Sequence, residues 1–304
     1  MLRLIGNTPL VKLNRLVDAS CAEIYVKYEA VNPTGSMKDR MALAMIEGAE
    51  RRGELKPGGK VVEYTGGSTG SSLAMICALK GYKAHFVSSN GFAQEKLQTM
   101  RAFGATVELI HAKNGVLTAG VIDQMIARTK ELINEPNVFW PNQIHNLDNK
   151  LGYHPMGREI LAQLGSEIEE FVSVAGTGGC ISGNVEILKE ANPDLRVIAC
   201  EPYNVRNISG GDTSGKHKLE GIGLSFRPSI LRADLIHEVM PVKDEDAYRI
   251  AQQLASHEGI FGGITSGANV WAAMQRAKAI GPGKKIVTVI IDTGLRYLNG
   301  DLYP

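Results

Sequence analysis

The sequence predicts an α/β protein whose parallel sheets carry helices on both faces. Short apolar runs alternate along the chain with longer segments of helical periodicity. Most residues in each run are apolar, which is typical of strands that are buried on both faces of a sheet. A chain of 304 residues with 44% hydrophobic residues is long enough and apolar enough for one large or two modest domains.

Each element is predicted from its own pattern of apolar residues. The predicted strands are 23–28, 60–64, 84–87, 106–110, 171–175, 196–200 and 285–291. The predicted helices are 39–52, 69–80, 93–103, 116–134, 151–164, 180–190, 244–257 and 267–280. Two irregular stretches interrupt this alternation. We expect a domain boundary within 138–149, and the length of 202–228 is typical of a functional loop.

Composition argues against several classes of partner. The 33 Lys and Arg residues balance 32 Asp and Glu, so no basic surface for nucleic acid or anionic lipid is expected. No apolar run reaches the roughly 18 residues of a membrane helix, and the first residues lack a signal-peptide pattern. The four cysteines form no CxxC pair and the histidines form no i, i+4 pair. Neither a disulfide framework nor a metal site is therefore expected, and the expected location is the cytoplasm.

Three glycine-rich loops each follow an apolar strand, at 65–70, 176–180 and 292–294. The first two precede helices, where main-chain N–H groups and the helix dipole favour an anion. Each loop alone could equally be a tight turn. Several such loops in one chain favour a ligand cleft at the carboxyl ends of the strands.

Lys38 follows the polar turn 32–37 and stands at the start of a predicted helix. The positive end of the helix dipole disfavours a protonated ammonium, and an amine of lowered pKa is a better nucleophile. Lys38 is therefore a candidate Schiff-base lysine, although most lysines in polar turns are simply solvated.

Two other interpretations fit parts of the sequence. Ser68 lies in a G-x-S-x-G pattern between a strand and a helix, as in the nucleophile elbow of an α/β-hydrolase. The last histidine, His257, falls inside a helical pattern, and no HGGG-like segment precedes Ser68. A dinucleotide site would pair the glycines at 176 and 178 with Glu201, but the third fingerprint position is occupied by Ile181.

Six segments in order along almost the whole chain resemble one family. They are I-G-N-T-P-L at 5–10, K-x-E-x-x-N-P-x-x-S-x-K-D-R at 27–40, G-T-G-G at 176–179, E-G-I-G at 220–223, G-I-T-S-G-A at 263–268 and D-T-G-x-R-Y at 292–297. Together they resemble the cysteine synthase and cystathionine β-synthase family of fold type II pyridoxal-phosphate enzymes.

The resemblance implies two doubly wound parallel-sheet domains, similar to tryptophan synthase β, with the cofactor in the cleft between them. The smaller domain would cover 35–139, and the larger would take 1–34 and 140–304. It also implies a homodimer.

The resemblance also implies a set of site residues. Lys38 would carry pyridoxal 5'-phosphate as an internal aldimine, and Thr293 would hydrogen-bond the pyridine nitrogen. Ser68 would face the phenolic oxygen. The remaining expected contacts fall into two groups: Gly176, Thr177, Gly178, Gly179 and Cys180 for the phosphate, and Thr65, Gly66, Gly67, Thr69 and Gly221 for the substrate.

The implied reaction is β-replacement on a serine-derived amino acid through an α-aminoacrylate, with sulfide or another nucleophile. The alternative is β-elimination from serine or cysteine, which releases pyruvate and ammonia. Lys38 would act as the base at the α-carbon in either reaction.

The chain departs from the family pattern at several positions. The loop reads T-G-G-S-T-G where the family has T-S-G-N-T-G, so Ser68 has a shorter reach and Gly66 is expected to open space. A glutamine for the substrate carboxylate, expected near 138–139, is absent there. Cys180 replaces threonine, and H-P-M at 154–156 replaces a Thr-Thr pair. We therefore expect either poor use of O-acetylserine with sulfide or a preference for another substrate pair. Restoring Ser at 66 and Asn at 68 should raise cysteine synthase activity.

Overall fold

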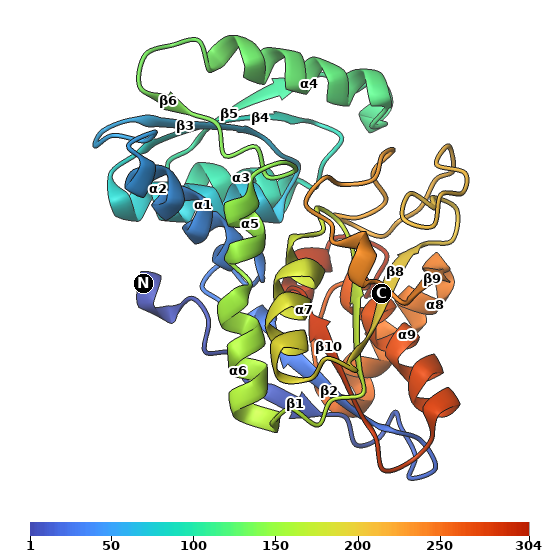
Figure 1. Cartoon of the computed structure of the whole chain (residues 1–304). Coiled ribbons are helices and arrows are strands. Elements are labelled where there is room, and N and C mark those ends of the chain that lie inside the picture. Colours follow the sequence, from blue (N-terminus) through green and yellow to red (C-terminus); the bar gives the residue numbers. More distant parts are fainter. Residues whose placement is uncertain (304) are drawn as a thin grey trace. The chain divides into compact units, whose positions relative to one another are not determined.

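The computed structural model describes residues 1–303. The chain divides into two compact units, each shown in Figure 1. Unit 1 consists of Met1–Ile5 and Lys38–Gly152, and unit 2 consists of Gly6–Met37 and the described chain from Tyr153 onward. We retain as a proposal that the smaller domain covers residues 35–139.

Unit 1 contains a four-stranded sheet in the order β5-β4-β3-β6, in which every neighbouring pair is parallel. Its strands are β3 (Lys60–Tyr64), β4 (Lys83–Ser89), β5 (Thr106–Ile110) and β6 (Val138–Phe139). Its helices are α1 (Lys38–Arg52), α2 (Ser68–Lys80), α3 (Gln94–Ala102), α4 (Ala119–Leu132) and α5 (Leu147–Leu151). In Figure 1, α4 covers one face of this sheet, and α1, α2 and α3 lie on the other.

Unit 2 contains a six-stranded sheet in the order β1-β2-β10-β7-β8-β9. Its strands are β1 (Leu10–Lys12), β2 (Glu23–Tyr28), β7 (Glu170–Val174), β8 (Arg196–Pro202), β9 (Glu238–Val242) and β10 (Lys285–Ile290). Its helices are α6 (His154–Leu164), α7 (Gly179–Ala191), α8 (Asp244–Gln253) and α9 (Ile264–Ile280). In Figure 1, α6 and α7 lie on one side of the sheet, and α8 and α9 lie on the other.

The predicted α/β class and parallel sheets are confirmed, with one exception at the edge of unit 2. There β1 pairs with β2 in the antiparallel sense. Three strands, β1, β6 and β9, are not predicted from the sequence. The first two have three and two residues, too few for a pattern, and β9 contains Pro241, which is tolerated in a sheet only at an edge such as this one.

Two predicted helices also differ from the structure. The helix predicted over 151–164 begins only at His154, as α6, because Leu151 is the last residue of the separate helix α5. Pro155 lies in the first turn of α6, where proline is tolerated. The helix predicted over 244–257 is α-helical only to Gln253 and then forms a π-helical turn, η5 (Leu254–Glu258).

Residues 203–232 contain neither helix nor strand, in agreement with the predicted irregular stretch. Among the described residues, every helix is too short or too polar to span a bilayer. The same residues contain no cluster of three or more histidine, cysteine or acidic side chains that could hold a metal ion.

One carboxylate is buried inside the sheet of unit 1. Glu63 on β3 is 0% exposed and lies between the apolar Val62 and the loop that begins at Thr65. It accepts hydrogen bonds from Trp140 Nε1 at 2.9 Å, from the Gln143 N–H at 3.2 Å and from the N–H of the next residue at 3.1 Å. Burial nevertheless dominates and raises the pKa of Glu63 to about 7.

This burial predicts a pH-dependent component of stability. The folded state keeps the proton on Glu63 up to about pH 7, whereas the unfolded state releases it near 4.5. The folded state therefore holds more protons in this window, and Glu63 should lower the free energy of unfolding by about 3 kcal/mol as the pH rises through it. Denaturant unfolding of wild type and Glu63→Gln at each pH isolates this component. A difference between the two proteins that does not change with pH would contradict the prediction.

Candidate functional site

The turn before Lys38 is tied to the chain that follows β10. The Met37 N–H donates to Ile291 O at 2.9 Å, and the Thr293 N–H donates to Gly35 O at 2.9 Å. Gly35 has a φ of +73°, and a Cβ there would lie 2.6 Å from Thr293 Cγ2. Glycine is thus required for the turn and Thr293 to meet. Lys38 follows as the first residue of α1 and is half-buried.

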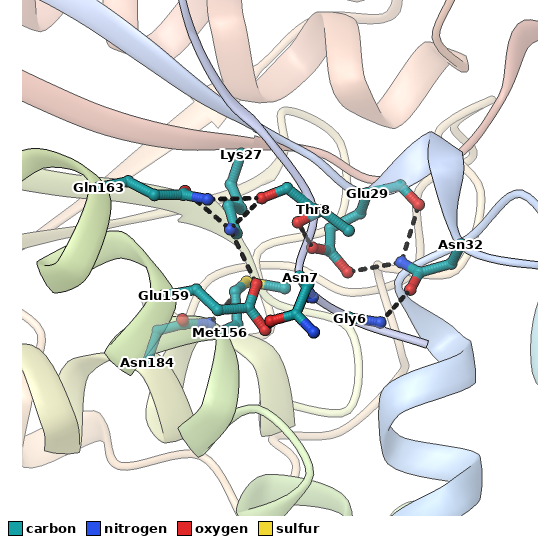
Figure 2. Close-up of polar contacts among 10 residues, drawn as sticks. All are labelled: Gly6, Asn7, Thr8, Lys27, Glu29, Asn32, Met156, Glu159, Gln163 and Asn184. Atoms are coloured by element: carbon teal, nitrogen blue, oxygen red, sulfur yellow. Dashed lines mark hydrogen bonds and ion pairs between the residues drawn. The ribbon is translucent and has the colours of Figure 1, made fainter. Parts of the chain in front are cut away.

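The same turn is anchored from its other end by a buried hydrogen-bond network, which Figure 2 shows. Asn32 Nδ2 donates to Glu29 Oε2 at 2.7 Å, and Asn32 Oδ1 accepts from the Gly6 N–H at 2.9 Å. Glu29 also accepts from Thr8 Oγ1 at 2.6 Å. The I-G-N-T-P-L segment and the lysine signature therefore form one scaffold.

Lys27 completes this scaffold, although it is 0% exposed. Its ammonium forms an ion pair with Glu159 at 2.8 Å and donates to Gln163 Oε1 at 3.0 Å and Thr8 O at 2.6 Å (Figure 2). A buried ammonium is tolerated only when it is fully paired in this way. This segment of the family pattern therefore has a structural explanation, namely that it fixes the N-terminal segment and the turn before Lys38.

Thr293 lies after β10 and caps the short helix η6 (Gly294–Tyr297). Its Oγ1 accepts from the Leu295 N–H at 3.3 Å. Because the oxygen accepts there, the hydroxyl proton can be donated to a ligand acceptor such as a ring nitrogen.

The loop 176–180 follows β7 and leads into α7. Gly178 has a φ of +85°, and a Cβ there would lie 2.8–3.0 Å from side-chain and main-chain atoms of Leu231. A Cβ on Gly176 would lie 2.0 Å from the carbonyl oxygen of Gly221. The structure thus brings Gly221 against the predicted phosphate loop, and both glycines are required for the fit.

The start of α7 has the features of an anion site. Its first turn contains no acidic residue, and the Gly178 N-cap supplies no side-chain cap. Thr177 Oγ1 accepts from the Gly179 N–H at 3.4 Å. The residues present therefore fit a phosphate group, which main-chain N–H donors and a hydroxyl at a helix N-terminus bind well.

Two departures from the family pattern meet beside this loop. Asn184 Nδ2 donates to Cys180 O at 2.8 Å and lies 3.2 Å from Met156 Sδ. Figure 2 shows Met156 beside Asn184. The replacements at 156 and 180 thus form a single packing arrangement behind the start of α7.

The loop 65–70 joins β3 to α2. Thr65 Oγ1 accepts from the N–H groups of Gly67 at 3.4 Å and Gly70 at 3.2 Å, which draws the loop into a compact turn. Gly67 is the N-cap of α2, and Ser68 is its half-buried first residue. The predicted substrate residues of this loop are therefore placed together at a helix N-terminus.

The expectation that Gly66 opens space is wrong. A Cβ on Gly66 would lie 2.0–2.4 Å from three ring atoms of Phe92. A Cβ on Gly67 would lie 2.9 Å from Cδ of Lys96, which is buried at 7% exposure. Phe92, from the segment before α3, and Lys96, on α3 itself, therefore occupy the space beside the two glycines.

No glutamine stands at 138–139, as the sequence shows, but the structure brings one from later in the chain to this loop. Thr69 Oγ1 donates to Gln143 Oε1 at 2.8 Å, so a glutamine does lie at the loop. It comes later in the irregular stretch than the end of β6 at Phe139, near which a glutamine was expected. Gln143 lies within the predicted boundary 138–149, and its presence there is the sequence signal for this contact.

The two other interpretations are not supported. Glu201, the acidic residue of the dinucleotide interpretation, accepts from the N–H groups of Ile208 at 2.8 Å and Ser209 at 3.2 Å and so holds the irregular stretch. His257, needed by a hydrolase with Ser68 as nucleophile, lies in η5 with Nδ1 at 2.8 Å from Ser256 Oγ.

Comparison with known proteins gives consistent results. The model of the family described as pyridoxal-phosphate dependent enzyme matches residues 1–292. A cysteine synthase of Staphylococcus aureus (strain N315) is 42% identical over 303 residues, which cover 99% of this chain and 96% of that protein.

Solved structures agree. A hydrogen sulfide-producing enzyme from Fusobacterium nucleatum superposes with a TM-score of 0.91 at 38% identity, covering 98% of this chain and 97% of that one. A cysteine synthase from Entamoeba histolytica superposes with a TM-score of 0.93 at 34% identity, covering 99% and 89%.

Proposed function

The chain belongs to the family of pyridoxal-phosphate dependent enzymes, and from that premise we propose the substrates and residues through which it works. Its reaction is β-replacement of the cysteine synthase kind. We propose a serine-derived amino acid as substrate and sulfide or another sulfur compound as nucleophile. The observation that carries the proposal is the hydrogen-bonded junction between the turn before Lys38 and Thr293.

Pyridoxal phosphate, when bound, withdraws electrons from the α-carbon of an amino acid and so allows its β-substituent to be exchanged. In our proposal, Lys38 attaches the cofactor, and its amine removes and returns the proton at the α-carbon. The Thr293 hydroxyl donates to the ring nitrogen, and Ser68 donates to the phenolic oxygen. The N–H groups of 176–180 and the Thr177 hydroxyl bind the phosphate.

The substrate carboxylate is assigned to the start of α2. The N–H groups of Gly66 and Gly67 and the hydroxyl of Thr69 are its proposed donors, with Gln143 beside them. Thr65 shapes the loop through its two accepted hydrogen bonds. Gly221 packs against Gly176, and we assign the loop around Gly221 to covering the bound substrate.

A second candidate is β-elimination, which one comparison favours. The similar Fusobacterium structure is described as a hydrogen sulfide-producing enzyme. Elimination from cysteine would release sulfide, with pyruvate and ammonia. For assembly and location we propose a cytoplasmic homodimer. Sedimentation of the holoenzyme tests whether it is a dimer.

The proposal is tested by titrating the yellow holoenzyme with O-acetylserine, O-phosphoserine, serine and cysteine while its visible spectrum is recorded. One of them should shift the cofactor absorbance, and adding sulfide should reverse the shift and yield cysteine. Pyruvate without cysteine would favour elimination. A colourless protein, or no spectral response to any of the four, would overturn the proposal.

A further inference from the structure

Two hydrogen bonds, one to the main-chain N–H and one to the main-chain carbonyl oxygen, hold Gln143 in place. Its N–H donates to Glu63 Oε2 at 3.2 Å, and its carbonyl oxygen accepts from Asn149 Nδ2 at 2.6 Å. The preceding residue, Asn142, has a φ of +47°, a conformation that non-glycine residues adopt at a cost. Such a conformation persists where surrounding hydrogen bonds enforce it, and here Glu63 and Asn149 supply them.

Glu63 reaches both ends of the segment that carries Gln143. One carboxylate oxygen accepts from Trp140 Nε1 at 2.9 Å, and the other accepts from the Gln143 N–H. Glu63 also lies on β3, only two residues before Thr65, where the substrate loop begins. One buried side chain on one strand therefore fixes the distance between Gln143 and the loop.

We propose that Glu63 is a positioning residue for substrate binding, which acts by holding the Gln143 carboxamide against Thr69 at the start of α2. The inference rests on the proposed role of this loop in binding the substrate carboxylate. Once ionised, as it is above its raised pKa of about 7, the Glu63 carboxylate suits the task because it offers only acceptors and meets donors from two directions. A glutamine at 63 keeps the shape but replaces one acceptor with a donor.

Glu63→Gln should therefore weaken substrate binding more than catalysis. We expect the dissociation constant of L-alanine, an amino acid without a leaving group at its β-carbon, to rise about tenfold when followed by cofactor absorbance. KM for O-acetylserine with sulfide should rise by a similar factor, with kcat within about twofold. In the apoprotein, Glu63→Gln should change the tryptophan fluorescence that comes from Trp140. The chain has one other tryptophan, Trp271, so comparison with Trp140→Phe identifies the Trp140 contribution.

The sharpest test is a double-mutant cycle with Gln143→Ala. If Glu63 acts through Gln143, then Glu63→Gln should change L-alanine binding by less than about twofold in the Gln143→Ala background. Glu170→Gln is the matched control, because Glu170 is also a buried sheet carboxylate, but it pairs with Arg276 in unit 2. This control should bind L-alanine as wild type does.

Several outcomes would overturn the inference. An equal effect of Glu63→Gln in both backgrounds would show that it does not act through Gln143, and so would a loss of cofactor affinity without a change in L-alanine binding. Glu63→Asp, which keeps the charge but withdraws it by one methylene, should also weaken L-alanine binding, and it serves if Glu63→Gln does not fold. A wild-type protein that binds the cofactor but neither amino acid refutes the proposed function instead, and the inference with it.

Discussion

Lys38→Ala is expected to reduce turnover by about a thousandfold or more while leaving the protein folded. The variant removes the amine proposed to attach the cofactor and to move the proton at the α-carbon, and each role contributes a large factor. Alanine is a strong helix former, and position 38 is the first residue of α1, so the helix should persist. Steady-state turnover and circular dichroism measure the two expectations.

The covalent link supplies a second measurement and its control. Borohydride reduction of the wild-type holoenzyme should fix the cofactor to the peptide that contains Lys38, and the variant should not be labelled there. Lys96→Met is the control, because Lys96 is a second lysine of unit 1, itself buried, that is not proposed to attach the cofactor. It should remain labelled at Lys38. Turnover retained by Lys38→Ala, or a label on Lys96, would refute the assignment.

The parts of the fold that the sequence predicts are those whose pattern is local. The runs that become β2, β3 and β5 are rich in apolar and β-branched residues over five or six positions, and their predicted bounds match the structure. The short strands β1 and β6 offer no such pattern. They form because a neighbouring strand supplies hydrogen bonds, which a single segment of sequence does not reveal.

The same distinction applies to the candidate site. The glycines at 35 and 178 signal tight turns in the sequence, and both have the positive φ expected of such turns. What faces a glycine is a tertiary contact, however. The sequence indicates that Gly66 lacks a side chain, but Phe92, which fills that space, comes from a different loop. Likewise, the carboxylate that holds Gln143 lies on β3, far from it in sequence.

This contact changes what is expected of the loop. Restoring serine at Gly66, which the family pattern favours, would place Cβ 2.0 Å from the nearest Phe92 ring atom. The partly buried ring packs against a core cluster that includes Val62 and Val87, so moving it away from position 66 disturbs that packing. Gly66→Ser should therefore destabilise the protein by about 3 kcal/mol, at the upper end for overpacking, and should raise KM for O-acetylserine. Denaturant unfolding and steady-state kinetics measure these effects.

Phe92→Ala should remove this clash, so that serine is tolerated at position 66. Removing the ring costs stability by itself, but in its absence the serine should cost little, giving a favourable coupling of about 2 kcal/mol between the two positions. The double variant should then use O-acetylserine better than Gly66→Ser alone. Gly67→Ala is the matched control, because the atom it meets belongs to the flexible chain of Lys96, which can shift, and its cost should be smaller. Additive effects of Gly66→Ser and Phe92→Ala on the free energy of unfolding would show that the Phe92 ring does not determine which side chain is tolerated at position 66.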